Sequence, residues 1–125
     1  MFKKLLIILA VSCLSAILFI GCGSSSNGPN PVHMSGTTFV QSSITIKKGE
    51  SVTLINDDLV GSHIIANGTW ENDGAQPATE AGMPEVNDVN IGGSSSVIVG
   101  PFTTVGTFKL YCTIHKNMNL TVIVQ

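Results

Sequence analysis

The chain has 125 residues, enough for one folded domain and a short leader but not for two hydrophobic cores. Its net charge of −2 becomes −4 once Lys3 and Lys4 of the leader are left out, so the remainder is acidic. Only 11% of the residues are charged, and arginine, the residue best suited to bidentate phosphate contacts, does not occur. This composition excludes a dedicated nucleic-acid surface.

Residues 1–21 have the layout of an export signal. Lys3 and Lys4 form a short basic start, and an apolar stretch follows from Leu5 to Ile20. The alternative is a permanent transmembrane helix, but the apolar stretch is slightly short for a full span and no cluster of charges follows it. We expect residues 1–21 to be a signal peptide and the protein to be exported.

Residues 18–22, with the sequence LFIGC, resemble the lipobox of bacterial lipoproteins, in which the cysteine becomes the lipidated first residue. Gly21 fits the position directly before the cysteine, whereas Phe19 stands where leucine is commonly preferred. The resemblance implies lipidation at Cys22 and several acyl chains, which hold a protein to a membrane by burying their methylenes. We therefore expect a lipid-anchored protein on the periplasmic or extracytoplasmic face of a membrane.

The segment after this cysteine is rich in glycine, serine, asparagine and proline, and it has too little apolar surface to fold by itself. We predict that residues 22–35 comprise the lipidated cysteine and a flexible linker. His33 and Met34 fall in this segment, where weak metal binding is the alternative to ordinary solvated residues. The folded domain is then expected to span residues 36–125.

From residue 36 onward, short alternating apolar segments are separated by turn residues, and no segment shows sustained helical periodicity. In the clearest strand, Phe108, Leu110 and Cys112 share one face. Seven or eight strands in this length predict an all-β domain, a Greek-key β-sandwich. The expected strands cover residues 44–46, 52–54, 62–66, 86–91, 95–99, 107–112 and 120–124.

Residues 67–93 fit the strand pattern poorly because they are long and rich in glycine, asparagine, aspartate and proline. We expect an irregular lobe at residues 74–84. The acidic side chains of this region form either an ordinary solvated surface or a docking patch for a basic partner. They are Glu71, Asp73, Glu80, Glu85 and Asp88.

Cys112 calls for an explanation, because Cys13 lies in the leader and Cys22 is the predicted lipid attachment site. An unpaired cysteine in an exported, oxidising setting has either a partner chain or a ligand role. His115 follows three residues later and Met118 three residues after that. A thiolate, an imidazole and a thioether on one short loop favour copper over magnesium, calcium or manganese.

His63 is the candidate for a fourth ligand, since it is the other histidine within the predicted domain. Taken alone, a histidine here fits a surface residue, a cysteine fits an inert buried thiol, and a methionine fits packing. Taken together, two histidines, a cysteine and a weak axial methionine are the donor set of blue copper electron-transfer sites. The predicted metal ligands are His63, Cys112, His115 and Met118.

The run TFKLYCTIH at residues 107–115, followed by Met118, resembles the last strand and ligand loop of the cupredoxins, with the short spacing of amicyanin-like members. The resemblance covers about residues 36–125 and implies one copper ion near one end of the sandwich, with the ring edge of His115 as the electron port. Ile114 replaces a proline that is common in the family, and Ile64 replaces an asparagine that braces the ligand loop in plastocyanin-like members. The contacts behind the ligands must therefore differ.

These residues favour a one-electron carrier in a membrane-associated chain, with one ligand set serving both Cu(I) and Cu(II). We expect a monomer that is not an enzyme and that exchanges electrons with redox proteins such as a cytochrome or an oxidase. The alternative is a copper-handling protein without redox turnover, but such proteins tend to use tracts rich in methionine or histidine. A multicopper oxidase or nitrite reductase needs further histidines, and only His33 remains. Trp70 and Tyr111 fit packing, with electron relay as the alternative.

Overall fold

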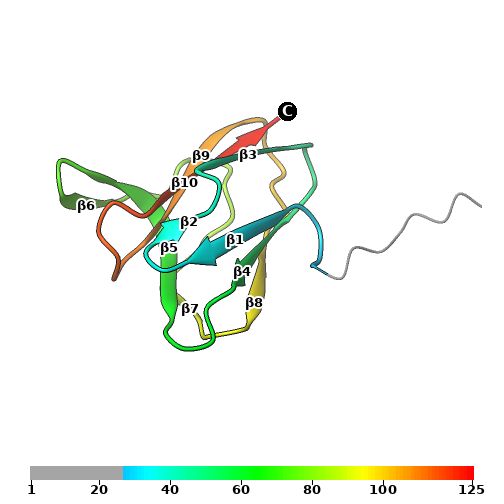
Figure 1. Cartoon of the computed structure of the whole chain (residues 1–125). Coiled ribbons are helices and arrows are strands. Elements are labelled where there is room, and N and C mark those ends of the chain that lie inside the picture. Colours follow the sequence, from blue (N-terminus) through cyan, green and yellow to red (C-terminus); the bar gives the residue numbers. More distant parts are fainter. Residues whose placement is uncertain (1–26) are drawn as a thin grey trace, which may run out of the picture.

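The computed structural model describes residues 27–125 and is drawn in Figure 1. The predicted signal peptide and the predicted lipidation of Cys22 lie outside the described residues. Between residues 27 and 125 the chain forms ten strands, and no helix long and apolar enough to cross a membrane occurs there. The strands are β1 (Pro31–Ser35), β2 (Thr38–Phe39), β3 (Ser43–Ile46), β4 (Val52–Asn56), β5 (His63–Glu71), β6 (Gly74–Pro77), β7 (Val89–Ile91), β8 (Ser96–Val99), β9 (Gly106–Cys112) and β10 (Asn119–Val124).

Two sheets make up the domain. One has the strand order β2-β1-β4-β8, and the other has the order β3-β10-β9-β5-β6, with β7 also paired to β5. The β1–β4 and β3–β10 pairs are parallel, and the other pairs are antiparallel. The predicted all-β sandwich is confirmed, with ten described strands rather than seven or eight because β1, β2 and β6 were not expected.

One hydrophobic core joins the two sheets, and the alternation of apolar residues along the strands explains it. Leu120 and Val122 of β10 are 1% and 0% exposed, while the residue between them, Thr121, is only partly covered. Burying a leucine or valine side chain contributes about 1.5–3 kcal/mol to folding. The same alternation in β9 turns Leu110 and Cys112 inward, both at 0% exposure.

The predicted linker is wrong for residues 31–35, which form β1. Val32 and Met34 are 0% exposed within the core, and β1 pairs in parallel with β4 along its length. Two apolar residues among proline, serine and asparagine form a weak sequence signal, because most of the stability of β1 comes from β4 and the core. His33 points away from this core, with its Nδ1 atom 2.9 Å from both carboxylate oxygens of Asp57.

The β5–β6 hairpin, residues 63–77, replaces part of the irregular lobe predicted at residues 74–84. Strand β5 continues to Glu71 and pairs with β6 across a two-residue turn, Asn72-Asp73, whose φ angles are 48° and 63°. Asparagine and aspartate tolerate these positive angles, which the favoured type I′ hairpin turn requires. At Gly68 an added Cβ atom would collide with the carbonyl oxygen of Gln76, so the two strands approach closely there.

The remaining part of the long region, residues 78–88, is irregular but attached to the sheet by Asn67. This side chain is 4% exposed, donates to the carbonyl oxygen of Pro84 at 3.1 Å and accepts from the amide of Val86 at 2.6 Å. Met83 and Val86 are thereby held against the core. The strand expected at residues 86–91 is shorter, since β7 begins only at Val89.

Candidate metal centre

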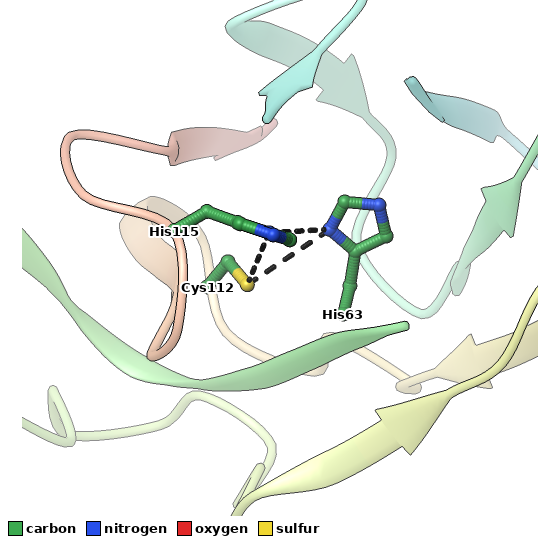
Figure 2. A group of neighbouring side chains, drawn as sticks. All are labelled: His63, Cys112 and His115. Carbon is green, nitrogen blue, oxygen red and sulfur yellow. Dashed lines mark hydrogen bonds between the residues drawn. The ribbon is translucent and has the colours of Figure 1, made fainter. Parts of the chain in front are cut away.

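Three predicted ligands meet at one end of the sandwich. His63 is the first residue of β5 and Cys112 the last residue of β9, and antiparallel pairing aligns Ile65 with Cys112, which brings these strand ends together. His115 lies on the loop of residues 113–118 and turns back toward them, as Figure 2 shows. His63 and Cys112 are 1% and 0% exposed, whereas His115 is partly exposed.

The donor atoms of these residues form a small triangle. The Nδ1 atoms of His63 and His115 are 3.1 Å apart, and Cys112 Sγ lies 3.9 Å and 3.4 Å from them respectively (Figure 2). A point equidistant from the three atoms is about 2.0 Å from each, close to bonds of about 2.0–2.3 Å from a first-row metal ion to imidazole nitrogen and thiolate sulfur. The donor set therefore fits a single metal ion.

The protonation of His63 also suits metal binding. Burial lowers the pKa of His63 most, the nearby His115 lowers it further, and Asp58 partly opposes both. At neutral pH the ring is therefore neutral, and a neutral imidazole is the form that binds metals. Because the two facing Nδ1 atoms are so close, they cannot both carry a proton, and at least one presents a lone pair toward the centre of the triangle.

Met118 lies beside this triangle in a tight loop. Its side chain is 2% exposed, its amide donates to the carbonyl oxygen of His115 at 3.2 Å, and its carbonyl accepts from the amide of Cys112 at 3.0 Å. The axial role of the thioether stays a prediction. Within residues 27–125, His63, Cys112 and His115 are the one group of close histidine, cysteine and acidic donors, so His33 is not part of it.

Trp70 of the β5–β6 hairpin contacts the base of the ligand loop, and no sequence pattern indicated this contact. The indole nitrogen of Trp70 donates to the carbonyl oxygen of Cys112 at 2.8 Å. The side chain of Asn119 bonds to the backbone of Trp70 in both directions, at 2.7 Å and 3.1 Å. Trp70 pairs with Ala75 of β6 and lies beyond the β5 residues that pair with β9, so neither alternation nor turn residues could reveal this contact.

Apolar side chains surround the exposed edge of the site. Leu59 and Val60 are 86% and 84% exposed, and together with His63 and His115 they line one shallow pocket. Ile114, in the ligand loop, is 51% exposed. The pocket also contains the carboxylate of Asp58, so its lining is mixed. Exposed large apolar side chains next to a partly exposed histidine are typical of a contact surface for a partner.

Several acidic side chains of residues 71–88 have partners within the domain. Glu80 accepts from the amide of Lys109 at 3.1 Å, and Asp73 lies 3.4 Å from the ammonium group of Lys116. Burial raises the pKa of Tyr111, and the nearby Asp88 raises it further. The docking patch for a basic partner stays a prediction, with fewer free carboxylates than the sequence suggested.

Comparison with known proteins also indicates a copper-binding protein. The sequence model of the plastocyanin/azurin family, described as copper binding proteins, matches residues 30–125. No curated protein sequence gives a match. Among solved structures, amicyanin from Paracoccus versutus (Thiobacillus versutus) is 19% identical, with 82% of this chain and 95% of that chain covered and a TM-score of 0.57.

Two further structures resemble the fold. A variant of amicyanin in its reduced state is 20% identical, with 81% of this chain and 86% of that chain covered and a TM-score of 0.59. A copper-containing nitrite reductase from Thermus scotoductus SA-01 is also 20% identical, with 78% of this chain but only 22% of that chain covered and a TM-score of 0.57. Likeness at these identities establishes a shared fold.

Proposed function

The chain belongs to the plastocyanin/azurin family of copper-binding proteins, and we propose that it carries single electrons in a membrane-associated electron-transfer chain. It is a blue copper protein with a cupredoxin fold and binds one copper ion. The observation that carries the proposal is the triangle of His63, Cys112 and His115, whose donor atoms meet at one end of the sandwich at distances that fit one metal ion.

The ligand residues would hold the ion as follows. His63, Cys112 and His115 provide the two imidazoles and the thiolate, and Met118 is the predicted weak axial donor. Bound copper supplies a reversible one-electron change between Cu(I) and Cu(II). The protein contributes rigidity, because His63 and Cys112 are anchored by strand pairing and their near-complete burial excludes water from the donor atoms.

His115 is proposed as the electron port. Its ring is the partly exposed member of the triangle, and the apolar rim of Leu59, Val60 and Ile114 lies around it. A redox protein with an apolar contact face could approach this ring over Leu59 and Val60, with Asp58 as the charged group at the same pocket. We propose no catalytic role, since a second copper centre needs additional histidines and the third one, His33, bonds to Asp57 instead.

Visible spectroscopy and voltammetry test the carrier function. Addition of Cu(II) to the purified protein should produce one intense thiolate-to-copper absorption band at a stoichiometry of one ion per chain. The band should disappear on reduction and return fully on oxidation, with reversible one-electron voltammetry. A faint band or irreversible redox behaviour would favour the alternative, a copper-handling protein.

The membrane location is the second part of the proposal. Export and lipidation at Cys22 rest on the LFIGC sequence, and β1 begins at Pro31. The eight residues between them can reach at most about 30 Å even when fully extended, so the domain would remain near the membrane surface. Partners would then also be held at that surface.

Cys22→Ala tests the anchor. This change should release the protein from the membrane fraction or stall its processing, because the predicted attachment point for the acyl chains is removed. Fractionation of cells followed by detection of the protein provides the measurement. Cys13→Ala is the matched control and should leave the location unchanged, while membrane retention of a normally matured Cys22→Ala variant would contradict the proposal.

A further inference from the structure

The loop that connects β9 to β10 has few bonds of its own. Residues 113–118 contain no proline, Ile114 is 51% exposed, and Asn117 adopts a positive φ of 61°. Within the loop and at its ends, Cys112 and Met118 share one backbone hydrogen bond, and Met118 bonds to His115. A loop with this composition is not stiff by itself, so the position of His115 depends on contacts from outside the loop.

Trp70 of β5 makes the first of these contacts, at the base of the loop. Its indole N–H donates to the carbonyl oxygen of Cys112 at 2.8 Å, and its ring packs edge-on against Tyr111 with centroids 6.0 Å apart. The backbone of Trp70 is bonded in both directions to the side chain of Asn119, just after the loop. Trp70 is thereby attached to both ends of the segment that carries His115.

Asp73, in the turn of the hairpin, contacts the outer part of the same loop. One carboxylate oxygen accepts from the side-chain amide of Asn117 at 3.0 Å, and the other lies 3.4 Å from the ammonium group of Lys116. Each exposed contact contributes little alone. They act together, however, because the hairpin already holds the turn beside the loop, and Figure 1 shows β6 and this loop on the same side of the molecule.

We propose that the β5–β6 hairpin is a brace for the copper loop and that Trp70 is the positioning residue for Cys112. The peptide after Cys112 is held at both ends, because its carbonyl oxygen accepts from the indole of Trp70 and its N–H, that of Thr113, donates to the carbonyl oxygen of Ile64 at 2.7 Å. On the other side of Cys112, its own amide donates to the carbonyl oxygen of Met118. The direction of the Cys112 side chain is thereby restrained from both sides. The consequence for copper rests on the proposed function, whereas the consequence for the loop does not.

The test compares three variants of the full chain. Trp70→Phe keeps an aromatic ring against Tyr111 but removes the N–H donor. Asp73→Gly removes both contacts at the turn and tolerates the positive φ of 63° at this position. Gln76→Ala is the control, an exposed change on β6 of the same hairpin. Amide hydrogen exchange is measured at Cys112 and Met118 in the copper-free and Cu(II)-loaded protein, together with the thiolate-to-copper bands of the loaded protein.

The expected result is faster exchange at both amides in Trp70→Phe, by about fivefold, which corresponds to the loss of one ordinary hydrogen bond. The thiolate-to-copper bands should shift in position or relative intensity in this variant, and the midpoint potential should move with them. Asp73→Gly should give a smaller change of the same sign. Gln76→Ala should remain within about twofold of the parent in exchange and keep its spectrum.

The outcomes separate the brace from the carrier function. If the parent has an intense band but Trp70→Phe shows unchanged exchange, bands and potential, the brace is refuted and the carrier function is not. A parent without an intense band would refute the proposed function, and exchange in the copper-free proteins would still decide the brace. Should Trp70→Phe fail to fold, Asp73→Gly decides instead, and an effect no larger than that of Gln76→Ala would overturn the proposal.

Discussion

The two halves of the metal site are held in different ways. His63 and Cys112 lie at strand ends, are almost fully buried and are fixed by the pairing of β5 with β9. His115 and Met118 belong to a loop with few internal bonds, and residues of the β5–β6 hairpin contact that loop from outside. The comparison teaches that strand pairing and the core place His63 and Cys112, whereas hydrogen bonds from the hairpin hold the ligand loop and its junction with Cys112.

We call His63 and Cys112 the strand-borne half of the site, and His115 and Met118 the loop-borne half. The largest expected effect follows from removing the thiolate of the strand-borne half. Cys112→Ser keeps the shape of the side chain but replaces sulfur with a much less polarizable oxygen, so the intense absorption band should be lost completely. The copper-free variant should lose only a small part of its free energy of unfolding, in contrast to the complete loss of the band. An intense blue or red colour in this variant would mean that the thiolate of Cys112 does not bind the copper.

The ligands could be predicted because most of the evidence is local. Cys112, His115 and Met118 are within seven residues of one another and follow a cleanly alternating strand, while His63 followed as the remaining histidine of the predicted domain. The predictions from sequence were wrong where strand pairing stabilises a segment that has little apolar alternation of its own. Val32 and Met34 are too few to mark a strand by themselves, yet β4 and the core stabilise β1.

The brace could not be predicted for a similar reason. Strand β6 is partly or fully exposed along its length and has no apolar alternation, so it depends on β5 for its pairing. The bond from Trp70 to Cys112 joins residues 42 positions apart. The pairing of β5 with β9 covers Ile65 to Asn67, so the position of Trp70 depends on the path of β5 beyond that pairing.

The next largest effect tests whether the core holds the strand-borne half. Leu120→Ala removes a side chain that is 1% exposed and faces Leu110 across the β9–β10 pair. The cavity should lower the free energy of unfolding by about 2–5 kcal/mol. Denaturant unfolding of the copper-free protein measures this change, and Ile98→Ala, at a position that is 61% exposed, is the control.

For this comparison, Ile98→Ala should stay within about 0.5 kcal/mol of the parent. Equal losses in the two variants would show that burial in the core does not account for the rigidity of the site. The Cu(II)-loaded Leu120→Ala variant should keep its thiolate-to-copper band under conditions where it is folded, because no donor has been removed.

A smaller effect is expected in the loop-borne half, at Met118. Met118→Leu removes a donor that helps the more highly charged Cu(II), so the midpoint potential should rise. Met118→Gln offers a harder oxygen that favours Cu(II), so the potential should fall. Both variants should remain coloured, because the copper–thiolate bond is intact, and voltammetry of both measures the shifts. Identical potentials in the two variants and the parent would remove Met118 from the ligand set.

X-ray absorption at the copper edge of the Cu(II)-loaded protein tests the central claim most directly, because it reports which atoms bind the ion. The donor triangle predicts two imidazole nitrogens at about 2.0 Å and one sulfur at no more than about 2.3 Å. Cys112→Ser should lose the short sulfur contribution and keep the nitrogens. A spectrum of the parent protein that contains only nitrogen and oxygen neighbours would contradict a copper site built on His63, Cys112 and His115.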